Sequence, residues 1–153
     1  MVSKAKSGDV FEIKTSMGLA YFQCVRRVPD WGMMIRVLIG TYSERPNSLV
    51  AITQQAERFL TFFPIDFAWK KKIVALAGCE DIPATVQRNP LFRAPGLRDR
   101  EGRVMKWFLI DGDREIPLSF LTLEQKKLPI QVMVNDTALV EMIENNWVPE
   151  HQV

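Results

Sequence analysis

The 153-residue chain is poor in the residue types on which most enzymes depend, with one histidine and two cysteines. Acyl and phosphoryl transfer usually need a positioned base beside a nucleophile or a metal. His151 stands in a polar tail, and no P-loop, GxGxxG, HExxH or GxSxG spacing occurs. We therefore expect a protein that is not an enzyme, without a catalytic residue, a metal site or a cofactor.

A strong charge of one sign is also absent, because 20 basic residues face 18 acidic ones and leave a net charge of +2. Nucleic-acid binding is therefore disfavoured, although a local basic patch remains compatible with this balance. No apolar run approaches the roughly 18 residues of a membrane span, and residues 1–6 lack the apolar core of a signal peptide. We expect a cytoplasmic location and no membrane partner, and no pattern specifies an oligomeric state.

The two cysteines, Cys24 and Cys79, stand inside apolar runs without other metal-ligand residues beside them. Such an environment favours buried, reduced thiols over a disulfide or a zinc site.

What is present is ordinary globular material, 47% hydrophobic and 25% charged, which suits one domain over residues 1–153. Its first part, residues 8–78, has the pattern of a β-meander or barrel. Phe11, Ile13 and Thr15 alternate with polar or opposite-facing neighbours, as in a half-buried strand. Further strands are expected at 19–28, 33–42, 59–63 and 73–78. The strand at 33–42 should be covered on both faces, and the strand at 59–63, which Pro64 bounds, should end there or lie at an edge.

Residues 79–103 form a connection rich in proline and arginine, and we expect it to be irregular. Long loops often carry function. Arginine and aromatic residues anchor protein interfaces, so the candidate partner-binding residues are Trp31, Arg88, Phe92, Arg93, Arg98, Arg100 and Arg103. The alternative is a solvated loop that Asp99 and Glu101 partly neutralise.

Residues 104–148 are expected to form a strand followed by one or two helices. The strand, 104–110, ends at Asp111-Gly112-Asp113, which indicates a hairpin turn, although Asp111, Asp113 and Glu115 alternate as acids of a metal or glycosidase site also do. Thr122 and Gln125 have capping-box spacing, and Asn135 can cap a helix whose buried stripe is Ala138, Leu139, Met142 and Ile143.

Four motifs recur in the order found in a bacterial family of polymorphic-toxin immunity proteins, the twenty-sixth of the numbered immunity series, which this chain resembles. They are Gly8-Asp9-Val10-Phe11-Glu12-Ile13, the Trp107 strand ending in Asp111-Gly112, Leu121-Thr122-Leu123-Glu124-Gln125 with Leu128-Pro129-Ile130, and Trp147-Val148-Pro149-Glu150. The resemblance implies an α+β fold of mainly antiparallel strands, with an SH3-like barrel core and C-terminal helices. It also implies a partner, the cognate toxin, which the protein would neutralise by occluding it.

Two other functions remain open from the residues. A small nucleic-acid-binding β-barrel would use Arg26, Arg27, Arg36 and the arginines of the 88–103 loop, with affinity that falls steeply with salt. An enzyme would use Asp111 or Asp113. The weakly basic charge also disfavours an inhibitor that mimics nucleic acid in a nuclease cleft, because such an inhibitor should be strongly acidic.

Overall fold

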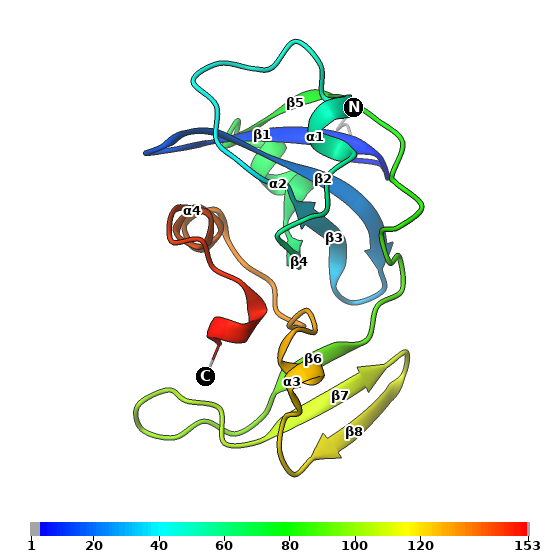
Figure 1. Cartoon of the computed structure of the whole chain (residues 1–153), viewed down its shortest axis with the longest axis vertical. Helices are drawn as coiled ribbons and strands as arrows, with labels where there is room; N and C mark the ends of the chain where they lie inside the picture. Colours follow the sequence, from blue (N-terminus) through cyan, green and yellow to red (C-terminus); the bar gives the residue numbers. More distant parts are fainter. Residues whose placement is uncertain (1–3, 153) are drawn as a thin grey trace.

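The computed structural model describes residues 4–152, and its larger part is a five-stranded antiparallel sheet (Figure 1). The strands are β1 (Asp9–Thr15), β2 (Gly18–Val28), β3 (Gly32–Val37), β4 (Phe59–Phe63) and β5 (Val74–Cys79), in the order β4-β3-β2-β1-β5. The predicted alternation in β1 holds in part: Phe11 and Ile13 share one buried face and Lys14 is exposed, but Val10 on the opposite face is fully buried in a separate cluster with Tyr21 and Leu38. β3 ends at Val37 rather than at the expected Tyr42, because the regular ladder is interrupted around Gly40, which has a φ of +93°, and Tyr42 rejoins β2 only as an isolated bridge to Leu19.

A second, three-stranded antiparallel sheet lies beyond the first (Figure 1). It contains β6 (Phe92–Pro95), β7 (Trp107–Asp111) and β8 (Arg114–Leu118), in the order β6-β7-β8. The expectation of an irregular connection over 79–103 is wrong at β6, which pairs with β7 despite its arginine and proline. The hairpin turn predicted after Asp111 is confirmed.

The helices are short, and side chains cap the start of two of them. They are α1 (Val50–Thr53), α2 (Ile65–Lys70), α3 (Leu123–Lys126), α4 (Asp136–Glu144) and the 3₁₀ helix η1 (Pro149–His151). Thr122 and Gln125 form the predicted capping box of α3, and the Asn135 side chain accepts a hydrogen bond from the Ala138 N–H at 2.8 Å. No helix within residues 4–152 has both the length and the apolar character needed to cross a bilayer.

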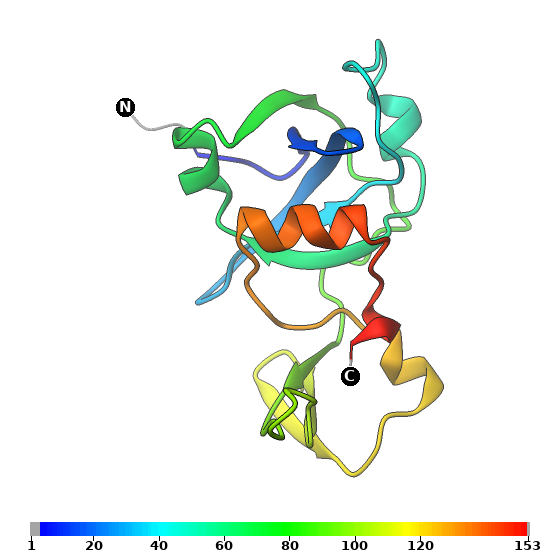
Figure 2. The same cartoon turned by 90° about the vertical axis from the view of Figure 1, so that its left-hand side faces the viewer.

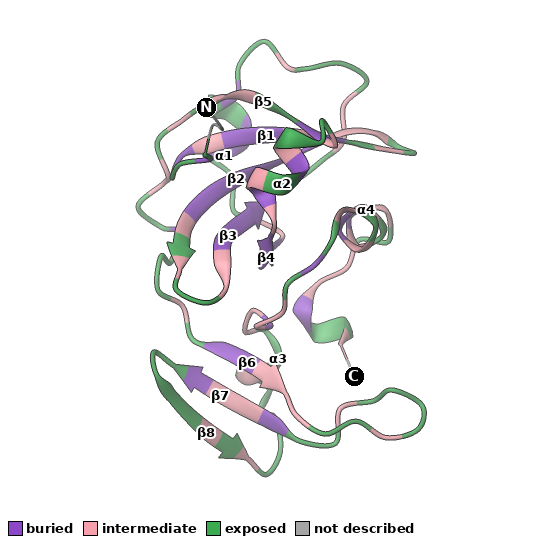
Figure 3. Ribbon diagram, turned by 180° about the vertical axis from the view of Figure 1, so that it is seen from behind, coloured by how far each residue is buried: buried purple, intermediate pink, exposed green. Residues whose placement is uncertain are grey.

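The largest core lies between the five-stranded sheet and α4, which crosses the face of that sheet (Figure 2). Leu139 and Ile143 on the predicted stripe are buried against β1 and its neighbours. Trp147, just past the helix, returns to the sheet and meets the Phe59 ring edge-on at 5.0 Å. Burial colours show the same distribution, with β1 to β4 mostly buried and β8 largely exposed (Figure 3).

A second cluster joins the two sheets. The Phe62 ring on β4 lies 5.4 Å from the Trp31 ring and 5.4 Å from the Phe92 ring on β6. Segment 129–134 also reaches both sheets, because the Gln131 N–H donates to the Arg93 carbonyl and the Val134 N–H donates to the Phe62 carbonyl. Apolar packing and main-chain bonds therefore both hold the small sheet against the large one.

The fold is α+β with mostly antiparallel strands, as expected, and the strands form two sheets. A closed SH3-like barrel is not confirmed, since β4 and β5 are the two ends of an open sheet order. Cys24 is buried and free, in agreement with the sequence, but Cys79 is exposed because it ends the edge strand β5.

Candidate protein interface

Three of the seven candidate partner-binding residues lie at the joint between the sheets rather than on an open surface. Phe92 and Arg93 are buried in β6, and Trp31 is half-buried against Phe62. The sequence pattern placed Arg93 in a cationic loop; the structure corrects this, because Arg93 pairs with Leu109 of β7, and its main chain donates to the Pro129 carbonyl and accepts from the Gln131 N–H.

Arg93 is a buried cation that connects the small sheet to the C-terminal segment. Its Nη2 donates to the Pro149 carbonyl at 2.5 Å and to the Lys126 carbonyl at 3.3 Å, while the guanidinium lies 4.1 Å from the centre of the Trp107 ring. Within residues 4–152, its Nε and Nη1 have no hydrogen-bond partner. Burial lowers the pKa of Arg93, and the charge of Glu150 opposes that shift. This set of contacts assigns Arg93 to the interior.

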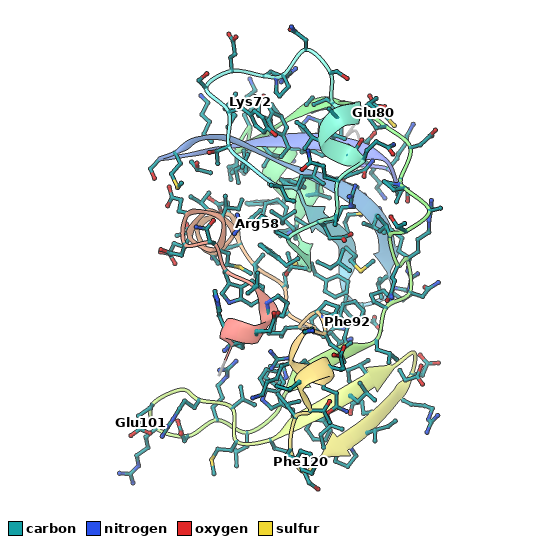
Figure 4. The ribbon with its side chains drawn as sticks, viewed as in Figure 1. Arg58, Lys72, Glu80, Phe92, Glu101 and Phe120 are labelled. Atoms are coloured by element: carbon teal, nitrogen blue, oxygen red, sulfur yellow. The ribbon has the colours of Figure 1, made fainter. Side chains whose placement is uncertain are left out.

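Arg98, Arg100 and Arg103 are exposed on a turn whose residues form hydrogen bonds with one another. The Asp99 carboxylate accepts the N–H groups of Glu101 and Arg103, each at 2.9 Å, and the Arg103 Nε at 3.0 Å. Arg98 donates to the Gly102 carbonyl at 2.7 Å. Figure 4 shows Glu101 at the tip of this loop, away from both sheets.

Arg88 is exposed on the connection before β6, and its carbonyl accepts a hydrogen bond from the Arg26 Nε at 2.8 Å. Arg88 is therefore adjacent to Arg26 and separate from the loop that carries Arg98, Arg100 and Arg103.

Exposed apolar side chains gather on the same small sheet and its flanks. Leu97, Met105, Phe120 and Leu123 are between 65% and 78% exposed, and we name these four residues the distal patch. The Met105 N–H donates to the Leu97 carbonyl at 2.7 Å, and Met105 shares a surface hollow with Leu118 and Ser119, which precedes Phe120. Phe120 lies at the lower end of the molecule in Figure 4. Exposed apolar groups at one end of a molecule commonly mark interaction sites.

Sequence reasoning missed the distal patch because single exposed leucines resemble core residues in a sequence. One signal was available: Leu97 and Met105 flank the charged turn 98–103 on both sides, where a solvated loop would carry polar residues.

Two of the three β2 and β3 arginines named for nucleic-acid binding are already engaged by carboxylates. Arg36 is fully buried and donates to the Gln23 side chain at 2.6 Å and the Gln55 carbonyl at 2.6 Å, with Glu57 3.4 Å from its Nε. Burial lowers the pKa of Arg36, opposed by Glu57. Arg27 forms an ion pair with Asp66 at 2.8 Å.

The acidic residues of the β7–β8 hairpin do not assemble into a metal-binding group. Asp111, Asp113 and Glu115 are exposed along the hairpin. In the part of the chain that the structure describes, no three His, Cys, Asp or Glu residues gather closely enough to hold a metal ion.

No family model, curated protein or solved structure matches this chain. The resemblance to immunity proteins accordingly rests on the four sequence motifs, and the interface is argued from the geometry described above.

Proposed function

We propose that this chain acts by binding a protein, without catalysing a reaction, and that its partner is a cognate bacterial toxin which it occludes in the cytoplasm. The distal patch is the observation that carries the protein-binding part of the proposal. Four large apolar side chains stand mostly in solvent at one end of the molecule. The toxin as partner comes from the motif resemblance, and so does the proposal that the five-stranded sheet is of SH3-like type.

The chemistry of the distal patch suits a protein partner. Phe120 and Leu97 would fill apolar pockets, while Arg98, Arg100 and Arg103 on the adjoining turn would reach carboxylates or carbonyl groups at the rim. A standard interface buries about 800 Å² on each partner, so the patch would form its centre and neighbouring residues of β8 its rim.

The backbone of turn 98–103 is held by internal hydrogen bonds in the free protein, and this supports the proposal. Asp99 already accepts three hydrogen bonds from within the turn. An interface loop whose conformation is held in the free protein loses less conformational entropy when the partner arrives. The arginines are thus presented on a fixed backbone rather than on a loose one.

Binding of nucleic acid is the competing function, and its dependence on salt separates it from protein binding. Phosphate contacts lose affinity steeply between about 50 and 200 mM salt, whereas an apolar interface does not. Arg27 and Arg103 are paired with Asp66 and Asp99, which weakens the phosphate-binding alternative.

The test is capture of partners from native cell lysate with the tagged chain, washed at about 0.5 M salt, followed by mass spectrometry. The proposal predicts one retained protein in stoichiometric amount with a toxin domain. Phe120→Asp and Leu97→Asp should each reduce its affinity by at least about thirtyfold, the scale of a hot-spot residue. Met17→Asp is the matched control, because Met17 is also exposed, at 55%, but stands on the β1–β2 turn.

Two results would contradict the proposal. One is the recovery of nucleic acid alone at low salt and of nothing at about 0.5 M salt. The other is a retained toxin whose affinity falls with Met17→Asp but not with the distal-patch variants.

A further inference from the structure

Among the sheet edges in the described chain, the outer edge of β5 is the one that is neither covered by another segment nor protected by charge or proline. Segment 129–134 covers both β4 and β6 with main-chain hydrogen bonds. The β8 edge carries charged residues and Pro117, which discourage strand addition. β5 has the sequence Val-Ala-Leu-Ala-Gly-Cys, without charge or proline, and within residues 4–152 its main chain is bonded to no strand except β1.

Side-chain exposure agrees with an edge that is open. Leu76, in the middle of β5, is 40% exposed, and Phe67 on the adjacent α2 is 58% exposed. An exposed, uncharged edge strand is a template for a further strand.

The charges that flank β5 indicate which strand it would accept. Lys70, Lys71 and Lys72 precede it, and Glu80 and Asp81 follow it. In an antiparallel pair of two β5 strands centred on Leu76, the turn before β5 that carries Lys71 and Lys72 in one copy lies beside the end of β5 that leads to Glu80 and Asp81 in the other copy. A parallel pair would instead place lysine beside lysine and acid beside acid, which is destabilising.

We propose that β5 pairs antiparallel with β5 of a second copy of this chain about a two-fold axis near Leu76. The two five-stranded sheets then become one continuous sheet of ten strands. Such a contact is self-complementary, as a two-fold interface must be. β5 and the small sheet lie at opposite ends of the molecule (Figure 1), and Phe120 of the distal patch lies at the end with the small sheet (Figure 4), so the dimer leaves the patch free.

The test is sedimentation velocity at about 2 to 200 µM protein, with charge-swapped variants. The wild-type chain should dimerise as its concentration rises. The Lys71→Glu/Lys72→Glu double variant and the Glu80→Lys/Asp81→Lys double variant should each stay monomeric alone, since each then presents like charges across the axis. An equal mixture of the two variants should recover the dimer, because the opposite charges face one another again.

Lys126→Glu/Lys127→Glu is the matched control, since it makes the same charge change at α3 and should leave dimerisation unaltered. Far-UV circular dichroism verifies that every variant is folded. A wild-type chain that remains monomeric at about 200 µM would overturn the proposal, as would swapped variants that each dimerise as the wild type does. A monomer whose β5 amides gain exchange protection only with a captured protein would assign the edge to that partner instead.

Discussion

Replacement of Arg93 tests how the small sheet is held to the rest of the molecule. The arginine is fully buried and donates to the Pro149 and Lys126 carbonyls. Its packing and its hydrogen bonding are separable, because the guanidinium lies over the Trp107 ring while Nη2 bonds the Pro149 and Lys126 carbonyls. Arg93→Met keeps most of the packing volume and removes the charge, whereas Arg93→Ala removes both.

The expected free energies indicate that the packing of Arg93 stabilises the fold more than its charge does. Two hydrogen bonds from a charged donor contribute about 1.5 to 3 kcal/mol each, and a desolvated cation–π contact contributes about 2 kcal/mol. Against these stands a desolvation cost of several kcal/mol for a buried ion, with Nε and Nη1 unpartnered among the described residues. The net value of the charge is therefore near zero, and Arg93→Met should cost about 1 kcal/mol. Arg93→Ala adds a cavity and should cost about 3 to 4 kcal/mol.

Urea denaturation followed by circular dichroism measures both variants, with the slope of the transition compared to detect loss of two-state behaviour. Arg93→Lys is the third variant, since it keeps the charge but loses the flat surface over Trp107. Equal losses for Arg93→Met and Arg93→Ala would refute the reasoning, because they would show that the bonds to the C-terminal segment, rather than packing, determine the stability at this site.

Three further predictions concern the large sheet. Burial tends to raise the pKa of Glu12, but hydrogen bonds from Arg45 and Tyr21 outweigh it and leave the pKa lowered; its stabilising contribution should therefore be complete above its unfolded pKa and disappear as pH falls through the folded pKa. Glu12→Gln should flatten this acid dependence in urea titrations, and an unchanged slope would contradict the assignment. Leu139→Ala should cost about 3 kcal/mol, and a loss below about 1 kcal/mol by urea denaturation would mean that α4 is loosely packed. A thiol reagent should label Cys79 in the native protein and Cys24 only after unfolding, and equal native rates would contradict the placement of β5.

Short-range patterns located most of the elements. The period of two in β1, the proline after Phe63 and the caps Thr122 and Asn135 depend on neighbouring residues only, and each predicted element is found. β3 is shorter than its apolar run because the ladder is interrupted around Gly40, beyond which Tyr42 pairs with β2 only as an isolated bridge.

Long-range pairing accounts for what the sequence could not predict. Residues 92–95 resemble a loop in composition, and they form a strand only because β7 and segment 129–134 lie on either side of it. Arg93 is buried for the same reason, since Trp107 and the Pro149 carbonyl come from distant parts of the chain. The distal patch was missed because exposure is a property of the assembled fold. Cys79 is exposed because no strand follows β5 in the sheet.

Hydrogen–deuterium exchange of the chain, alone and in complex with the protein captured at about 0.5 M salt, tests the central claim most directly. If the chain neutralises its partner through the distal patch, amides in 97–106 and 118–124 should gain protection on binding, and Phe120→Asp should abolish that protection together with the complex. Unchanged exchange in both segments, with protection confined to the five-stranded sheet, would contradict the account.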